Sequence, residues 1–132
     1  MNNTRFGRVQ LQIMHVLWER GQATAREVTE ALNESEPISH STVQTLLRQL
    51  EKKQAIKHDV EQGDYGIKTF IYRPLVQPDS VRRKATRELV ERVFGGSPGG
   101  LVAYLLQHER IPRKDLERIQ RLIDVTRKVP KK

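Results

Sequence analysis

The spacing of apolar residues changes its period near residue 55, and this change limits the fold more than any other feature of the chain. Before it, three segments carry apolar side chains three and four positions apart, as amphipathic helices do. These segments are residues 9–20, 25–33 and 39–53. After it, residues 55–60 alternate and residues 68–73 are β-branched and aromatic, which indicates two strands. The glycine-bearing segment 61–66 between them predicts a projecting loop, so three helices followed by a β-hairpin are expected.

Capping residues mark the ends of the predicted helices. Gly21 follows the first helix, where a left-handed residue commonly ends a helix. Thr24 and Glu27 have the spacing of a capping box at the start of the second helix. Ser39 is a strong N-cap for the third helix. The predicted inward stripe of that helix consists of Val43, Leu46, Leu47 and Leu50.

A second helical region follows a boundary at residues 78–80. Helices are predicted over residues 81–94 and 101–106, with the glycine-rich segment 95–100 between them. Pro112 suits the first turn of a last helix. The apolar residues of this last helix that we expect to be buried are Leu116, Ile119, Leu122, Ile123 and Val125.

The predicted fold is mainly α with a small β-hairpin. Three helices followed directly by a hairpin are the order of the winged helix-turn-helix, in which the third helix lies in the major groove of DNA and the hairpin flanks it. We therefore predict a winged helix-turn-helix N-terminal domain at residues 1–76 and a helical C-terminal dimerisation lobe at residues 77–132.

The outer face of the third helix is polar and carries no acidic residue between positions 39 and 48. A helix that reads base edges needs small or hydrogen-bonding side chains near its N-terminus, and Gln44 can form two bonds with adenine. The helix N-terminus itself favours a phosphate. The alternative is the ordinary solvated face of an amphipathic helix. The candidate DNA-binding residues are Ser39, His40, Ser41, Thr42, Gln44, Thr45, Arg48 and Lys52, with Lys68 from the hairpin.

The hairpin is the weaker candidate for DNA contact because its charges oppose one another. Its cations are Lys57, Lys68 and Arg73, and its acids are Asp59, Glu61 and Asp64. Phosphate binding depends on local positive charge. We therefore expect a small contribution from the hairpin, through Lys68 and backbone amides.

The positive charge of the chain is concentrated in its second half. The net charge is +8, of which residues 76–132 carry +7. An excess of positive charge suggests an anionic partner such as nucleic acid, or a solvated basic surface. The basic run at residues 82–87 either faces DNA between two half-sites or lies on the surface of the dimerisation lobe.

The apolar faces of the last helices exceed what one small lobe can bury. Two copies packed there would form a dimer core and present two reading helices to a palindrome. The alternative is a monomer in which these helices fold back on the N-terminal domain. The candidate dimer-interface residues are Val90, Val93, Phe94, Leu101, Leu105, Leu116, Ile119 and Ile123.

Catalytic and metal-binding readings find little support. The chain has no cysteine, and its four histidines show no ligand spacing, so no metal site and no cofactor are expected. Residues 95–100 lack the lysine and the preceding strand of a phosphate-binding loop. No catalytic residue is assigned, and an enzyme is not expected.

No apolar run approaches the roughly 20 residues of a membrane helix, so we expect no membrane insertion and a cytoplasmic location.

Five runs of residues together follow one known pattern: 11–19, 23–28, 41–53, 72–76 and 92–97. They resemble the penicillinase/methicillin-resistance repressor family (BlaI/MecI/CopY type). The most specific element is Thr-Val-Gln-Thr-Leu-Leu at residues 42–47, with Leu-Trp upstream at residues 17–18. The resemblance covers roughly residues 8–126. It implies a winged-helix homodimer that represses transcription from a dyad operator of double-stranded DNA. In this family, release often follows cleavage of the dimerisation lobe by a membrane-bound sensor protease.

The chain departs from the family pattern at functional positions. Ser41 stands where the family usually has Lys, Arg48-Gln49 replaces Asn-Arg, and Gln54 replaces a common Gly. Tyr104-Leu105 occupies the position of the Asn-Phe bond that is cleaved in the best-known members, which makes it the candidate cleavage bond. The chain lacks the cysteine-rich tail of the copper-sensing branch.

Two other functions remain open from the sequence. The first is a winged-helix regulator that responds to a small ligand bound near Tyr104 in the dimer lobe. The second is a protein-interaction adaptor that uses the winged helix without DNA.

Overall fold

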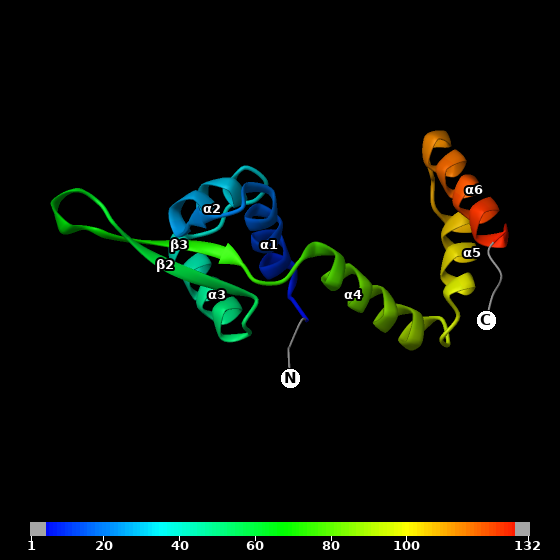
Figure 1. Cartoon of the computed structure of the whole chain (residues 1–132), viewed down its shortest axis with the longest axis horizontal. Helices are drawn as coiled ribbons and strands as arrows, with labels where there is room; N and C mark the ends of the chain where they lie inside the picture. The colour runs from blue at the N-terminus through cyan, green and yellow to red at the C-terminus, as the bar shows by residue number, and fades with distance from the viewer. Residues whose placement is uncertain (1–4, 129–132) are drawn as a thin grey trace. The chain divides into compact units, whose positions relative to one another are not determined.

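The computed structural model describes residues 5–128. Residues 1–4 and 129–132, which the two predicted domains include, lie outside the described residues. The chain forms two compact units, and the division along the chain falls between Thr86 and Arg87. The elements in chain order are α1 (Arg8–Arg20), β1 (Ala23–Thr24), α2 (Ala25–Asn33), α3 (His40–Lys52), β2 (Ile56–Gln62), a 3-10 turn (Asp64–Gly66), β3 (Lys68–Pro74), α4 (Pro78–Val93), α5 (Pro98–His108) and α6 (Arg113–Lys128) (Figure 1).

The first unit has the predicted order of three helices and a hairpin, with one strand that the sequence analysis missed. β2 and β3 pair antiparallel, with Lys57 opposite Arg73. The short strand β1 pairs along the other edge of β3, with Ala23 opposite Tyr72, which gives the sheet order β1-β3-β2. The β2–β3 hairpin extends beyond the helices of this unit (Figure 1). The arrangement is a winged helix-turn-helix with a three-stranded sheet.

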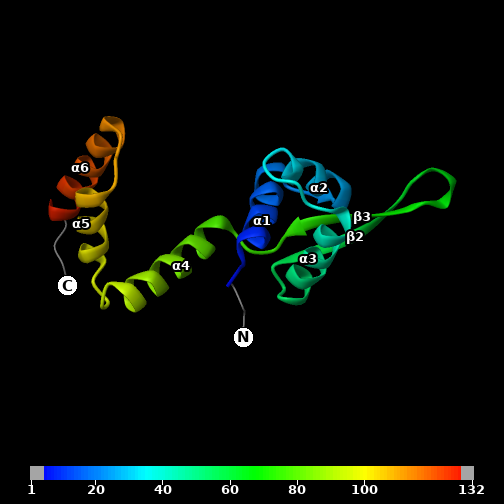
Figure 2. The ribbon, with the colours of Figure 1, turned by 180° about the vertical axis from the view of Figure 1, so that it is seen from behind.

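The core of this unit forms where α1, α2, α3 and the sheet meet, and the three helices lie beside the sheet in both overall views (Figure 2). Of the predicted stripe of α3, Val43, Leu47 and Leu50 are fully buried, whereas Leu46 is only partly buried. Burial of side chains of this size stabilises a fold by about 1.5–3 kcal/mol each. The stripe therefore fixes which face of α3 points outward. The other fully buried large side chains are Ile13, Met14, Leu17, Val28 and Ile56.

The predicted caps are confirmed. Gly21 ends α1 with a φ of 85°, a left-handed conformation that suits glycine. At the start of α2 the Glu27 amide donates to Thr24 Oγ1 at 3.1 Å, and the Thr24 amide donates to Glu27 Oε1 at 2.8 Å. The Thr42 amide donates to Ser39 Oγ at 3.1 Å at the start of α3. Both helices of the helix-turn-helix thus begin where their sequence signals place them.

The end of α3 explains the unusual residue at position 54. The Ala55 amide donates to the Leu50 carbonyl at 3.0 Å, and the Gln54 amide donates to the Glu51 carbonyl at 2.9 Å. This pair of bonds is a Schellman motif, which places the residue after the cap in the left-handed region. Gln54 occupies that place with a φ of 64°. A side chain there costs about 1–2 kcal/mol relative to a relaxed backbone.

The second unit corrects three expectations. α5 begins at Pro98 and not near residue 101, because Ser97 caps it by accepting from the Gly100 amide at 2.9 Å. Of the four glycines at residues 95–100, only Gly95 and Gly96, both with positive φ, lie between α4 and α5, and the other two belong to α5. Pro112 precedes α6, which starts at Arg113.

The apolar residues of α6 are not buried within the single chain, contrary to expectation. Leu122 is 58% exposed and Val125 is 60% exposed. Leu116 and Ile123 are also exposed, and Ile119 is partly buried. Two short helices and the end of a third offer too little surface to cover this face. Among residues 5–128, no helix is long and apolar enough to cross a membrane.

Gln54→Gly is expected to raise the free energy of unfolding by about 0.5–1 kcal/mol, because glycine relieves the left-handed strain. The gain is smaller than the strain itself, since glycine loses more conformational entropy on folding than glutamine does. Urea unfolding of the full chain measures the change. Gln54→Ala is the matched control, since alanine keeps the Cβ atom, and it should differ from the original chain by less than about 0.5 kcal/mol. Equal stability of the glycine and alanine variants would contradict the strain.

Candidate nucleic-acid interface

The outer face of α3 is fully available to solvent. Every candidate DNA-binding residue of the sequence analysis is exposed. The set consists of Ser39, His40, Ser41, Thr42, Gln44, Thr45, Arg48, Lys52 and Lys68. The buried stripe lies on the other side of the helix, so these side chains point away from the core.

Two polar clasps hold α3 in place. Asn33, at the end of α2, donates to the Ile38 carbonyl at 3.0 Å and accepts from the Ile38 amide at 3.1 Å, which fixes the turn before α3. At the other end, the nearly buried Gln10 of α1 donates to Gln49 Oε1 at 3.0 Å and accepts from Lys53 Nζ at 2.9 Å. Both ends of α3 are thereby tied to the helices beneath it.

Hydrogen bonds within α3 decide what Thr45 can offer. Its hydroxyl donates to the Ser41 carbonyl at 3.1 Å and accepts from the Arg48 guanidinium at 3.2 Å. The hydroxyl proton is therefore already used, and the methyl group is the part of Thr45 left for a partner. A threonine methyl matches the methyl group of thymine in the major groove.

The tautomer of His40 also follows from its contacts. Thr29 Oγ1 donates its single proton to the Ala25 carbonyl at 2.8 Å. The 2.9 Å contact between Thr29 Oγ1 and His40 Nδ1 then requires Nδ1 to carry the proton and donate. Nε2 is the ring atom left for an external hydrogen bond.

An open recess lies beside α3. Its volume is about 550 Å³, and it is bounded by the start of α2, the N-terminal half of α3 and strand β3. It brings Lys68 of the hairpin together with His40 and Gln44, and it adds Arg26, which the sequence analysis did not single out. Its lining consists of Thr24, Ala25, Arg26, His40, Gln44, Lys68, Thr69, Phe70 and Tyr72.

The cations of the hairpin are not equivalent. Arg73 pairs with Asp59 at 3.0 Å, so part of its charge is neutralised. The side chain of Lys68 makes no ion pair or hydrogen bond with the described residues. Lys68 is therefore the better placed of the two to meet an anion.

A cluster of rings and charges joins the end of α3 to the hairpin. His58 Nδ1 contacts Glu51 Oε2 at 2.5 Å, and its ring stacks on Phe70 with the centroids 4.1 Å apart. Burial, and then the Glu51 carboxylate, raises the pKa of the Tyr72 hydroxyl above its usual value, while Arg48 opposes them. The carboxylate of Glu51 is thus directed toward the hairpin.

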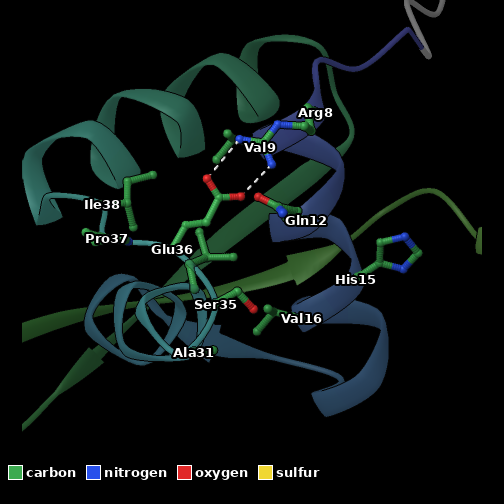
Figure 3. A pocket seen from close by; sticks show the side chains of 11 residues that line it. Arg8, Val9, Gln12, His15, Val16, Ala31, Ser35, Glu36, Pro37 and Ile38 are labelled. Atoms are coloured by element: carbon green, nitrogen blue, oxygen red, sulfur yellow. Dashed lines mark hydrogen bonds and ion pairs between the residues drawn. The ribbon is translucent and has the colours of Figure 1, made fainter.

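A second recess lies on the same unit but apart from the exposed face of α3. It has a volume of about 270 Å³ and lies between α1, the end of α2 and the segment before α3 (Figure 3). Arg8 and Glu36 meet across it at 2.8 Å, and the Arg8 hydrogen bond and charge lower the pKa of Glu36. Tyr104, which the small-ligand alternative requires, does not line it.

Four of the eight candidate dimer residues of the second unit are exposed in the single chain. Val90 is buried, and Phe94, Leu101 and Ile119 are partly buried. The exposed members are Val93, Leu105, Leu116 and Ile123.

The candidate cleavage bond between Tyr104 and Leu105 lies inside α5. Tyr104 stacks on His108 with the ring centroids 4.1 Å apart and meets Phe94 edge to face at 5.8 Å. A protease needs an extended backbone, so α5 must open locally before this bond can be cut.

Among residues 5–128, no three His, Asp or Glu side chains are grouped to hold a metal ion.

His58→Ala removes both the hydrogen bond with Glu51 and the stack on Phe70, and it should lower the free energy of unfolding by about 1–2 kcal/mol. His58→Phe keeps a stacked ring and loses only the hydrogen bond with Glu51, so its loss of stability should be smaller. Urea unfolding followed by circular dichroism compares the two. Unchanged stability in both variants would show that the cluster does not hold the hairpin to α3.

Comparison with known proteins identifies the family. The penicillinase repressor family model matches residues 6–125. The penicillinase repressor of Staphylococcus aureus is 22% identical over 117 residues, which cover 88% of this chain and 89% of that protein. The methicillin resistance regulatory protein MecI of Staphylococcus aureus (strain N315) is 22% identical over 113 residues, which cover 86% of this chain and 88% of MecI. The solution structure of the DNA-binding domain of the repressor BlaI is similar to this chain with 28% identity and a TM-score of 0.49. The matched part covers 59% of this chain and 90% of that domain. The chain therefore belongs to the penicillinase repressor family.

Proposed function

We propose that this chain is a transcriptional repressor that binds a dyad operator as a homodimer, with α3 in the major groove. The observation that carries the proposal is the exposed face of α3, which is free of acidic residues from position 39 to 48 and is continuous with the recess that holds Arg26 and Lys68. Membership of the penicillinase repressor family supports the same function. The bound dimer would repress by covering a promoter in the cytoplasm.

The side chains of α3 divide between base reading and positioning. Gln44 and the methyl group of Thr45 are suited to base edges, and Arg48 extends the same face. Ser39, Ser41 and Thr42 surround the helix N-terminus, where a phosphate is favoured. Lys52 adds salt-dependent affinity at the end of the helix.

The dimer in this proposal forms through the second unit. Its candidate residues include side chains as exposed as Val93, at 66%, and this apolar surface needs a partner. A two-fold dimer uses the same surface on both copies and holds the two α3 helices at a fixed separation. The predicted boundary at residues 76 and 77 lies ten residues before the end of the first compact unit at Thr86.

Relief of repression in this proposal follows loss of the dimer. Cleavage between Tyr104 and Leu105 by a membrane-bound sensor protease would cut α5 and break the apolar surface. Because the bond lies within a helix, the rate of cleavage would depend on local opening of α5.

DNA retardation at two salt concentrations tests the proposed function. The full chain should prefer its own promoter fragment over random DNA of equal length and lose affinity steeply as salt rises. A protein-interaction adaptor would show neither the preference nor the slope.

Thr45→Ala should cost about 1–3 kcal/mol of operator binding and much less on random DNA, because it removes the methyl group from a base contact. Replacing the contacted thymine with deoxyuridine should weaken the original chain and leave Thr45→Ala unaffected. Thr45→Val keeps the methyl group and is the matched variant. Equal losses on operator and random DNA would show that Thr45 only positions the helix.

A chain truncated after Thr86 should fold, remain monomeric and bind the operator weakly, because it keeps the first unit and loses the proposed dimer surface. Sedimentation equilibrium and DNA retardation measure both properties. A chain truncated after Val76 tests the predicted domain boundary and should be similarly stable, since it keeps the bond from Trp18 Nε1 to the Val76 carbonyl at 2.8 Å. Tight dimeric binding by either fragment would overturn this division of roles.

A further inference from the structure

We infer that the recess between α2, α3 and β3 binds one phosphate of the DNA backbone, held between Arg26 and Lys68. The inference rests on the proposed function and adds to it a named site and a residue, Arg26, that lies outside the predicted reading helix. Both residues line the same recess, although they are 42 positions apart in the chain.

The two cations are available to an anion. Both side chains are exposed, and neither makes an ion pair or a hydrogen bond with any described residue. None of the described residues that line the recess is acidic. The neighbouring acid Glu27 is occupied, because its carboxylate accepts from the Thr24 amide at 2.8 Å. The side chains of Arg26 and Lys68 are therefore both available to an anion that enters the recess, because neither is held by a described residue.

The remaining polar groups of the recess suit a phosphodiester. The guanidinium of Arg26 can bond two phosphate oxygens at once, whereas Lys68 contributes a compact charge. His40 is fixed with Nδ1 turned toward Thr29, which leaves Nε2 for an external partner. Gln44 borders the recess and also belongs to the reading face of α3, so a phosphate held here would set the depth and register of the helix in the groove.

A methylphosphonate scan of the operator tests the site. In each duplex one phosphate is replaced by a neutral methylphosphonate, and the affinity of the full chain is measured. Several positions should weaken binding, and at one of them in each half-site the loss of about tenfold should depend on Arg26 and Lys68, since their charge-assisted contact is lost there. Arg26→Gln and Lys68→Gln should each bind the unmodified operator about tenfold more weakly and should lose part of the sensitivity to the substitution at that position, because one of the two cations remains. The double variant should be insensitive to it. Each single variant should also lower the slope of log affinity against log salt by about one.

Arg20→Gln is the matched control, because Arg20 is an exposed arginine of the same unit that does not line the recess. It should keep full sensitivity to the methylphosphonate. Thermal unfolding should be unchanged in all of these variants, since the substituted side chains are exposed. The inference is overturned if Arg26→Gln, Lys68→Gln and the double variant retain the full sensitivity, or if no position weakens the original chain while operator preference persists. Absence of any operator preference in the original chain would instead overturn the proposed function.

Discussion

The burial of one stripe of α3 is the interaction on which the first unit depends. Val43, Leu47 and Leu50 are fully enclosed by the neighbouring helices and the sheet, so the helix cannot rotate without exposing them. The polar side chains on the opposite side are thereby held outward in one orientation. Apolar burial is non-directional, so it does not by itself fix the exact placement of the helix. Hydrogen bonds of Asn33 at one end and Gln10 at the other supply the directional contacts.

The contacts of α3 also sort its polar residues by role. Glu51, the acid of the last turn, directs its carboxylate to His58 of the hairpin. The hydroxyl of Thr45 donates to the Ser41 carbonyl within the helix, so its methyl group is the part available to a partner. The positive groups of the recess remain without partners in the described chain. The proposed interface therefore combines an exposed polar face of α3 with a nearby recess whose two cations, Arg26 and Lys68, make no ion pair with a described residue.

Local signals account for what could be predicted from the sequence. The period of apolar residues located α1, α2, α3 and the hairpin, and Thr24 and Ser39 marked helix starts because capping depends on neighbours three residues away. β1 was missed because a strand of two residues has no period. Arg26 was missed because its approach to Lys68 exists only in the folded chain. Burial on α6 was wrong for the single chain because helical periodicity shows which face is apolar and not what covers it.

Hydroxyl-radical footprinting of the full chain on its own promoter DNA tests the central claim most directly. The claim is that two outward faces of α3 read DNA at a separation set by the second unit. The account predicts two protected half-sites related by a dyad, with their centres about one helical turn, or a multiple of it, apart on one side of the duplex. Uniform protection along the DNA, or a single protected site without a symmetric mate, would contradict it.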